Sequence, residues 1–237
     1  MSDAVPNLSK TQYMMGKRCE LSMWFRRHGM HKNTASNNNG QVKSARAVGV
    51  EVGVLAQSWF GRGAEVKGNF LKVEKAVVET ERLVKSGEDI IFEAAVIHPL
   101  DGSNARIDAL VKVPGTSQWD LVEVKSSTKV KDSYIEDLSF QYHVFKGAGY
   151  DIRNAGILFV NNKYVRDGDV DPKNLFVLED ITDKVKDRQG TIETGIVNLN
   201  LVAVADEEPA AELGFQCNKP ADCDYKPHCW KNVPLYS

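Results

Sequence analysis

Residues 106–125 read RIDALVKV, then PGTSQ, then WDLVEVK, and this stretch decides the fold. Its two short apolar runs are rich in β-branched residues and flank a turn that contains proline and glycine, which is the pattern of a β-hairpin. Asp108 stands in the first run, and Glu123 and Lys125 stand two apart in the second. Because side chains alternate across a strand, Glu123 and Lys125 must project from the same face. The stretch therefore predicts two neighbouring strands that bring together two carboxylates and an ammonium group.

This grouping is chemically suited to a hard divalent cation, whose preferred protein ligands are carboxylate oxygens. A bound cation of that kind polarises a phosphate oxygen and lowers the pKa of bound water, while Lys125 can position the nucleophile or offset developing negative charge. The pattern therefore favours hydrolysis of phosphodiester bonds. The alternative is an exposed ion pair at a strand end, which has little energetic consequence.

The composition is that of an ordinary globular protein. The chain has 237 residues, of which 26% are charged and 42% hydrophobic, so it is long enough to bury a core as one domain. A net charge of −2 gives no overall basic field, and any nucleic-acid binding must come from a local patch. The chain contains no apolar run of transmembrane length and begins without a signal-peptide pattern, which predicts a cytoplasmic protein with no membrane association.

Apolar periodicity divides the remaining chain into helices and strands. Helices are predicted at about 7–27, 45–60, 69–86, 133–147 and 180–200. Strands are predicted at about 90–98, 106–113, 119–125, 155–161 and 175–178, the last as a short edge strand. A polar loop is predicted at 29–44 and a linker at 206–209. This order of elements predicts an α/β domain around a small mixed sheet flanked by helices.

Four cysteines stand near the two ends of the chain, at Cys19, Cys217, Cys223 and Cys229. In a chain without a secretion signal, a metal-binding or catalytic role explains them better than disulfides do. Four thiolates can hold zinc in tetrahedral geometry or an iron–sulfur cluster, and their spacing alone does not separate the two.

The hairpin and the helix after it resemble the PD-(D/E)XK nuclease superfamily in its RecB-like branch. The resemblance rests on Asp108, on Glu123-Val124-Lys125, and on Gln141 in the following helix. It implies a restriction-endonuclease-like core in which Asp108, Glu123 and the Val124 carbonyl bind Mg²⁺ or Mn²⁺. It also implies that Lys125 orients or activates the attacking water and that Gln141 positions the lysine or the DNA backbone.

The cysteines extend this resemblance over almost the whole chain, residues 8–230. One cysteine before the core and three after it is similar to the layout of iron–sulfur RecB-like nucleases, which include the CRISPR adaptation exonuclease and the AddB nuclease domain. The five-residue spacing of the late cysteines favours an uncharacterised bacterial sister family. The resemblance implies a structural [4Fe–4S] cluster that joins the chain ends through Cys19, Cys217, Cys223 and Cys229, with zinc as the alternative.

The expected organisation is a single nuclease domain over residues 1–237. An N-terminal helical segment at 8–45 would carry the first cluster cysteine, residues 46–200 would form the nuclease core, and residues 210–230 would form the cysteine-rich tail.

Two positions depart from the RecB-like pattern. Gly53 stands where many members have a metal-binding histidine in the helix before the sheet, and Glu51 is the nearest acidic substitute as a metal ligand. Phe145 stands where a tyrosine is usual, four positions after the glutamine.

Three other polar residues near the predicted sheet receive structural interpretations. Glu93 in the first strand is either close to the site or a strand-end glutamate, and the second interpretation is preferred. His98 and His143 are interpreted as hydrogen-bonded residues of the framework.

The sequence therefore predicts a Mg²⁺- or Mn²⁺-dependent deoxyribonuclease, and the resemblance implies an exonuclease acting on single-stranded DNA ends. The chain lacks the glycine-rich phosphate loop of helicases, so unwinding would need a helicase, recombination or adaptation partner. Candidate DNA contacts are Lys129 and Lys131, which follow the catalytic strand, and Arg18. Further basic candidates near the N-terminus are Lys10, Lys17, Arg26 and Arg27. The competing hypothesis is a non-catalytic DNA-binding module with a structural iron–sulfur or zinc site.

Overall fold

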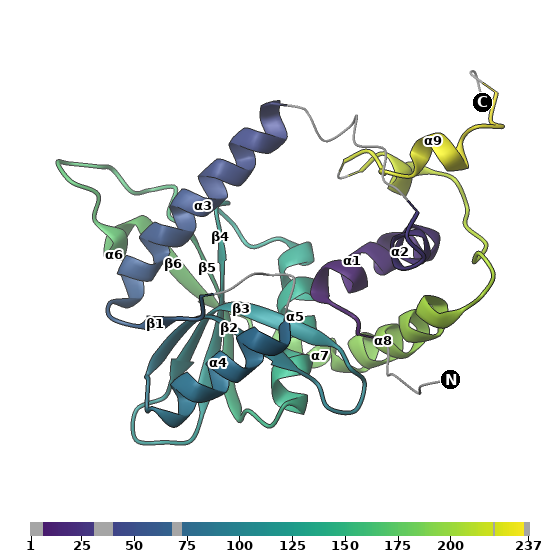
Figure 1. Ribbon diagram of the computed structural model, residues 1–237. Helices are drawn as coiled ribbons and strands as arrows, with labels where there is room; N and C mark the ends of the chain where they lie inside the picture. Colours follow the sequence, from purple (N-terminus) through teal and green to yellow (C-terminus); the bar gives the residue numbers. More distant parts are fainter. Residues whose placement is uncertain (1–6, 31–39, 68–72, 220, 235–237) are drawn as a thin grey trace.

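The computed structural model describes residues 7–30, 40–67, 73–219 and 221–234, and at 40–46 it describes the backbone alone. Its centre is one mixed sheet with strands in the order β1-β2-β3-β4-β5-β6, and helices cover both faces (Figure 1). The strands are β1 (Ala64–Glu65), β2 (Ile90–Ile97), β3 (Asn104–Lys112), β4 (Trp119–Lys125), β5 (Ile152–Val160) and β6 (Phe176–Asp180). The predicted α/β class, with a mixed sheet flanked by helices, is confirmed, and it is consistent with a restriction-endonuclease-like core.

The strands follow one another in space in the same order as in the sequence. β2, β3 and β4 form an antiparallel meander, whereas β4 and β5 run parallel. A parallel pair needs a crossover connection, and α5 (Asp132–Gly147) supplies it along one face of the sheet. β6 pairs antiparallel with β5 and is the edge strand that the sequence predicted.

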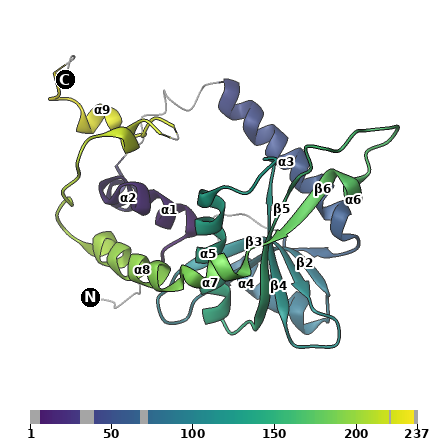
Figure 2. The ribbon, with the colours of Figure 1, turned by 180° about the vertical axis from the view of Figure 1, so that it is seen from behind.

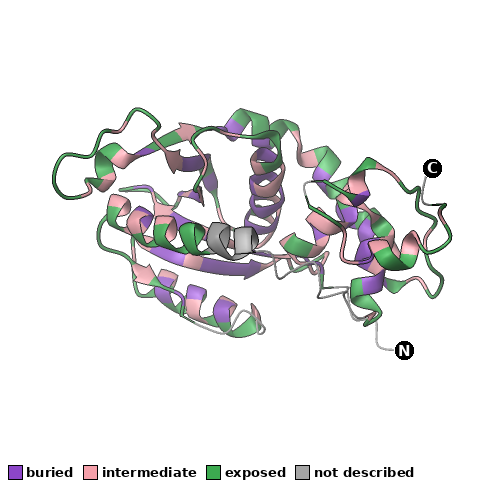
Figure 3. Cartoon of the chain, turned by 90° about the horizontal axis from the view of Figure 1, so that it is seen from above, coloured by how far each residue is buried: buried purple, intermediate pink, exposed green. Residues whose placement is uncertain are grey.

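α5 is the central helix, with most of its apolar side chains buried (Figure 3). It packs on β3 and β5, and α7 and α8 pack against it (Figure 2). α4 covers β2, and α3 packs on β4 from the other face. The helices besides α5 are α1 (Lys10–Arg18), α2 (Glu20–Arg27), α3 (Gly40–Phe60), α4 (Val73–Lys85), α6 (Pro172–Leu175), α7 (Thr182–Asp187), α8 (Gln189–Val204) and α9 (Lys226–Cys229), with a 3-10 turn at Phe215–Cys217. Among the described helices, none combines the length and the apolar character needed to span a lipid bilayer.

The alternation of side chains in β2 and β3 is interrupted at one level. Phe92 and Ala109 pair with each other and belong to the core under α3, whereas the next pair, Ala94 and Ile107, belongs to the core under α5. Asp108 and Glu93 lie between these pairs. The backbone of Glu93 has a φ of 58°, which is in the left-handed region. That conformation costs on the order of 1–3 kcal/mol for a residue other than glycine. Both acidic side chains line one cavity rather than entering either core.

Four sequence predictions were wrong in detail. The helix predicted at 7–27 is two helices, because the extended backbone of Cys19 (φ −165°) ends α1 and begins α2. The helix predicted at 180–200 is also two helices, α7 and α8, which are separated by Arg188. The loop predicted at 29–44 ends earlier, because α3 begins at Gly40, so the expected segment boundary after residue 45 falls inside a helix. Residues 31–39 of that loop lie outside the described residues. Glu93 lies in the middle of β2 and not at its end, because β2 pairs with β3 on both sides of it.

Candidate active site

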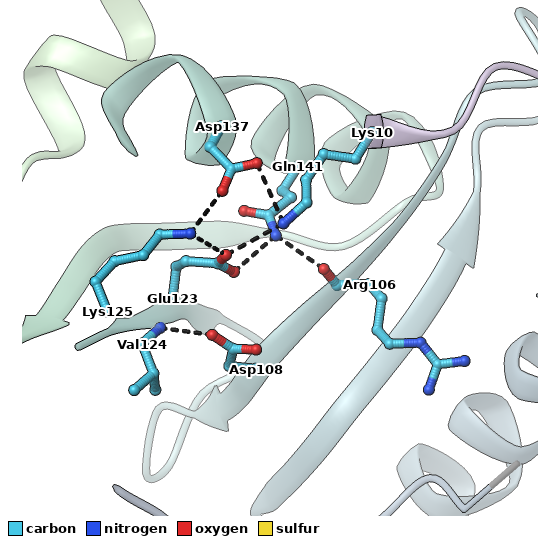
Figure 4. A network of polar contacts seen from close by, with 8 residues as sticks. All are labelled: Lys10, Arg106, Asp108, Glu123, Val124, Lys125, Asp137 and Gln141. Atoms are coloured by element: carbon cyan, nitrogen blue, oxygen red, sulfur yellow. Dashed lines mark hydrogen bonds and ion pairs between the residues drawn. The ribbon is translucent and has the colours of Figure 1, made fainter. Parts of the chain in front are cut away.

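The candidate site forms where the β3–β4 ladder ends. Its last paired residues are Ala109 and Val122, and one step further the Asp108 carboxylate accepts a hydrogen bond from the Val124 N–H at 2.6 Å. A side chain thus takes the place of a backbone partner at the point where the two strands separate. Figure 4 shows the carboxylates of Asp108 and Glu123 next to each other on these strands, as the hairpin predicted.

Glu123 is nearly fully buried, and both of its oxygens have partners. Oε1 accepts hydrogen bonds from Lys125 Nζ at 2.7 Å and from Lys10 Nζ at 3.1 Å, and Oε2 accepts one from Gln141 Nε2 at 2.8 Å. Gln141 Nε2 also donates to the Arg106 carbonyl at 2.8 Å, which fixes the orientation of the amide. The structure therefore brings together the predicted residues, and the glutamine contacts the carboxylate that the lysine contacts.

A third carboxylate, which the sequence analysis missed, completes the network. Asp137 lies one turn before Gln141 on α5, accepts a hydrogen bond from Lys125 at 2.7 Å and forms an ion pair with Lys10 at 3.1 Å. The spacing of four residues places Asp137 and Gln141 on one face of the helix, and this signal was available in the sequence. Two lysines and two carboxylates alternate in a closed arrangement (Figure 4). We call it the Glu123 ring; its members are Lys10, Glu123, Lys125 and Asp137.

The two strand carboxylates have opposite electrostatic environments. Burial, and then the neighbouring Glu123, raise the pKa of Asp108 to about 8. Burial opposes the ionisation of Glu123 as well, but Lys10, Lys125 and the hydrogen-bond donors outweigh it and lower the pKa of Glu123 to about 2. Near neutral pH, Glu123 is ionised while Asp108 holds a proton. Asp108 and Glu123 are adjacent, and their negative charges oppose each other when both are ionised. Such a pair suits a divalent cation, because the charge of the cation can replace the proton on Asp108.

The site faces a cavity of about 540 Å³ between α3 and the sheet. Asp108, Val124 and Lys125 line this cavity together with Glu93 and Tyr134, while Glu123 lies buried beside Lys125. The Lys125 ammonium stands 5.2 Å from the centroid of the Tyr134 ring, within the range of a cation–π contact. The atoms of the cavity wall that could bind a metal are oxygen atoms, so they suit Mg²⁺ or Mn²⁺ better than a thiophilic metal.

α3 forms the opposite wall of the cavity. Gly53 lines it, and a Cβ added there would meet no heavy atom within 4 Å. A histidine would therefore have room at this position. Glu51 is exposed on α3 and is not among the residues that line the cavity, and its role as a metal ligand stays a prediction.

The predicted DNA contacts occupy two different places. Lys129 and Lys131 are exposed on the connection that follows β4. Arg18 instead contacts the C-terminal tail, where its guanidinium donates to the carbonyls of Gln216 and Ala221, each at 2.6 Å.

The four cysteines come together where the two ends of the chain meet. Cys19, Cys217, Cys223 and Cys229 line one small cavity, and all four are free thiols. Cys19 supplies the break between α1 and α2, and the other three lie on the tail, where the Cys223 N–H donates to the Cys217 carbonyl at 2.8 Å. Burial, and then the three neighbouring cysteines, raise the pKa of the Cys229 thiol. A cationic centre would remove this mutual repulsion between thiolates.

Two dimensions of the four-cysteine site bear on what it can hold. The void between the cysteines is about 20 Å³, which is narrow for a cluster. Among the described cysteines, however, no three sulfur atoms lie within 4.8 Å of one another. A zinc ion about 2.3 Å from each sulfur requires the sulfurs to be about 3.8 Å apart. Every set of three cysteines therefore contains at least one sulfur pair that is farther apart than tetrahedral zinc requires.

A second polar cluster contacts the same central helix. His143 Nε2 lies 2.7 Å from Asp101 Oδ2, and the His143 and His98 rings stack with centroids 4.8 Å apart. Asp101 Oδ1 also accepts from the Ser103 N–H at 2.8 Å, and His98 Nδ1 accepts from the N–H groups of Leu100 and Asp101. We call His98, Asp101 and His143 the Asp101 cluster. Two histidines and a carboxylate are a common metal-ligand set, but here Ser103 and backbone N–H groups already donate to Asp101 Oδ1 and His98 Nδ1.

Comparisons with known proteins give no family assignment. No family model and no curated protein matches the chain. Three solved structures resemble it over most of both chains. The crystal structure of SSO0001 is 10% identical with a TM-score of 0.39, over 89% of this chain and 90% of the other. LHK-Exo in complex with dAMP is 13% identical with a TM-score of 0.36, over 84% and 88%. The alkaline exonuclease LHK-Exo from Laribacter hongkongensis is 14% identical with a TM-score of 0.33, over 82% and 92%. Likeness at this level carries no functional argument, which must come from the site.

Proposed function

We propose that this chain is a metal-dependent DNA nuclease that hydrolyses phosphodiester bonds. One observation carries the proposal: Asp108 and Glu123 lie side by side at the end of a strand ladder, Lys125 contacts Glu123, and Asp108 and Lys125 line a cavity of about 540 Å³. If the ion pairs only stabilised the fold, a carboxylate such as Asp108, which lines the cavity and resists ionisation, would add nothing to that stability. A site that binds a cation together with a phosphate gains from such a carboxylate.

The residues divide the chemical work by their contacts. A cation held by Asp108, Glu123 and the Val124 carbonyl would supply a Lewis acid and a water of lowered pKa. Gln141 holds Glu123 in its rotamer through Oε2. Burial opposes charge on Lys125, but Glu123 and Asp137 outweigh it and raise the lysine's pKa. Lys125 therefore acts as a hydrogen-bond donor that orients the attacking water and offsets charge on the phosphate.

We propose single-stranded DNA ends as the substrate, on the strength of the RecB-like resemblance. Lys129 and Lys131 are exposed on the segment that leaves the active-site strand and are suited to contact the phosphate backbone. A helicase, recombination or adaptation partner would supply any unwinding.

We also propose that the four cysteines bind a [4Fe–4S] cluster with a structural role, which would join α1 and α2 to the tail. The grouping of four free thiols from both chain ends and the wide sulfur spacing support this proposal, and zinc is the alternative. Anaerobically purified protein should contain about four irons and absorb broadly near roughly 400 nm. A colourless protein with one zinc would overturn the cluster assignment and leave the nuclease assignment standing.

The decisive experiment for the nuclease is cleavage of labelled single-stranded DNA with Mn²⁺, with Mg²⁺ and with EDTA. Wild-type protein should cleave only with the metals, and Lys125→Ala should lower the rate by on the order of 10³-fold. Lys129→Ala, outside the Glu123 ring, should change the KM for DNA more than kcat. Cleavage by Lys125→Ala at the wild-type rate would refute the catalytic assignment. Tight DNA binding without cleavage under any metal would instead favour the non-catalytic module.

A further inference from the structure

Lys10 comes to the candidate active site from outside the sheet. It is the first residue of α1, and it lies 113 positions before Glu123 in the sequence. Its ammonium nevertheless stands 3.1 Å from Glu123 Oε1 and 3.1 Å from Asp137 Oδ1. The side chain is only 28% exposed, so an ammonium group has been desolvated to reach these two carboxylates.

The backbone around Lys10 is fixed from several directions. The Leu8 carbonyl accepts a hydrogen bond from the Asn104 N–H at 3.0 Å, so the residues before the helix adjoin the start of β3. Ser9 and Gln12 form a reciprocal capping box that sets the first turn of α1. Further along, Tyr13 packs on the Phe140 ring of α5 with centroids 4.7 Å apart.

The close packing of α1 continues toward the four-cysteine site. A Cβ on Gly16 would lie 2.4 Å from a methyl group of Leu199 on α8, so only glycine permits this approach without displacing that side chain. Cys19 ends the helix one residue after Arg18. The position of Lys10 in the active site is therefore tied to the packing of the chain ends.

The charges of the Glu123 ring show what Lys10 contributes. Lys125 contacts both Glu123 and Asp137, each at 2.7 Å, and without Lys10 it would be the nearest cation for both carboxylates. An ammonium that alone balances two anions keeps one of its three N–H donors for a water molecule or a phosphate and is held firmly at the carboxylates. With Lys10 present, each carboxylate has a second cation, and Lys125 can give up one contact at a lower cost.

We propose that Lys10 is a positioning residue of this nuclease: it shares Glu123 and Asp137 with Lys125 and so leaves Lys125 available to the water and the phosphate. This inference rests on the proposed function. The same charge also moderates metal binding, because a cation beside Glu123 repels a metal ion at the neighbouring carboxylates.

The test compares Lys10→Met with Lys85→Met, the same substitution at an exposed lysine of α4 outside the ring. Lys10→Met should lower kcat by about 10- to 100-fold with little change in KM for DNA, because a misplaced catalytic group costs this much. It should also bind Mn²⁺ about three- to tenfold more tightly in an electron paramagnetic resonance titration. Lys85→Met should match the wild type in all three measurements.

Two further variants separate charge from packing. Lys10→Arg keeps the charge and should restore Mn²⁺ affinity to the wild-type value, and it also serves if Lys10→Met does not fold. In the double variant Lys10→Met/Asp137→Asn, Lys125 has only Glu123 to neutralise, so the double variant should cleave faster than Lys10→Met alone.

The contrary results are distinct. An increase in KM at constant kcat would make Lys10 a DNA contact and overturn the proposal, as would unchanged Mn²⁺ affinity in a folded Lys10→Met. Absence of cleavage by the wild type would refute the proposed nuclease, while the Mn²⁺ titrations would still decide whether Lys10 acts on the metal site.

Discussion

Two polar clusters contact α5, the Glu123 ring through Asp137 and the Asp101 cluster through His143. Each combines carboxylate and basic side chains and connects the helix to the sheet. In the Glu123 ring the partners are long, charged side chains, and the neighbouring Asp108 faces a cavity. In the Asp101 cluster the partners include backbone N–H groups and a serine, and the rings stack on each other.

The difference shows what separates a functional cluster from a structural one. A cluster can bind a ligand when some of its acceptor atoms face a cavity and when the negative charge of a carboxylate has no balancing cation in the protein. Asp108, which keeps a proton near neutral pH, meets both conditions. The hydrogen bonds of Asp101 join a hairpin turn to a helix and stabilise their contact. The following predictions test that distinction, from the largest effect to the smallest.

Isosteric amides should affect the two clusters in opposite ways. Glu123→Gln removes a proposed metal ligand and the shared acceptor of two lysines, so cleavage should fall by on the order of 10³-fold. Asp101→Asn exchanges one acceptor oxygen for a donor and should lower the free energy of unfolding by about 1–2 kcal/mol. Its cleavage rate per folded molecule should stay within about twofold of the wild type. Nuclease assays and urea unfolding measure both, and loss of activity in a folded Asp101→Asn would contradict the comparison.

Metal affinity should depend on pH through Asp108. Its pKa is raised to about 8, so below that pH a cation must displace a proton, and above it none is displaced. Apparent Mn²⁺ affinity should therefore rise by about tenfold per pH unit toward pH 8 and then level off. Calorimetry in buffers of different ionisation enthalpy would count the proton released. Asp101→Asn is the control and should give the same curve, whereas a flat wild-type curve would contradict the raised pKa.

Two glycines, one beside each cluster, should respond differently to alanine. A Cβ on Gly147 would lie 1.8 Å from the His98 ring, so Gly147→Ala must displace the stacked histidines and should cost about 2 kcal/mol. Gly53 borders the open cavity on α3, and Gly53→Ala should stabilise the helix by about 0.5–1 kcal/mol. Thermal unfolding of the two variants side by side measures this contrast. Equal shifts in Tm for the two variants would contradict this contrast, because they would mean that a Cβ has the same space at both positions.

The Asp101 cluster should also weaken in acid. Burial raises the pKa of Asp101, but hydrogen bonds from His143 and Ser103 outweigh it and hold the pKa below its ordinary value. A lowered folded pKa contributes stability above the unfolded pKa of about 4 and loses it as pH falls through the folded value. The stability difference between wild type and Asp101→Asn should therefore shrink below about pH 4. Urea unfolding at pH 3 and pH 6 checks this, and a constant difference would contradict it.

The sequence by itself determined the elements whose physics is local. The alternation of β4 put Glu123 and Lys125 on one face, and the short turn before it placed Asp108 on the neighbouring strand. Helical spacing also put Asp137 on the face of Gln141, although that signal was not used. In each case the residues are close in sequence, so backbone geometry alone sets their relation.

Only the tertiary structure decided the rest. Lys10 reaches Glu123 because α1 packs against both α5 and α8. No local pattern of residues in the sequence encodes that packing. Glu93 takes a left-handed conformation in mid-strand, although β2 pairs with β3 in one register on both sides of it. The chain ends bring four cysteines together across about 200 residues, a proximity that the spacing of the residues does not encode and that only a family resemblance implied. Such relations depend on the sum of many distant contacts, whereas the hairpin depends on the alternation of one short stretch.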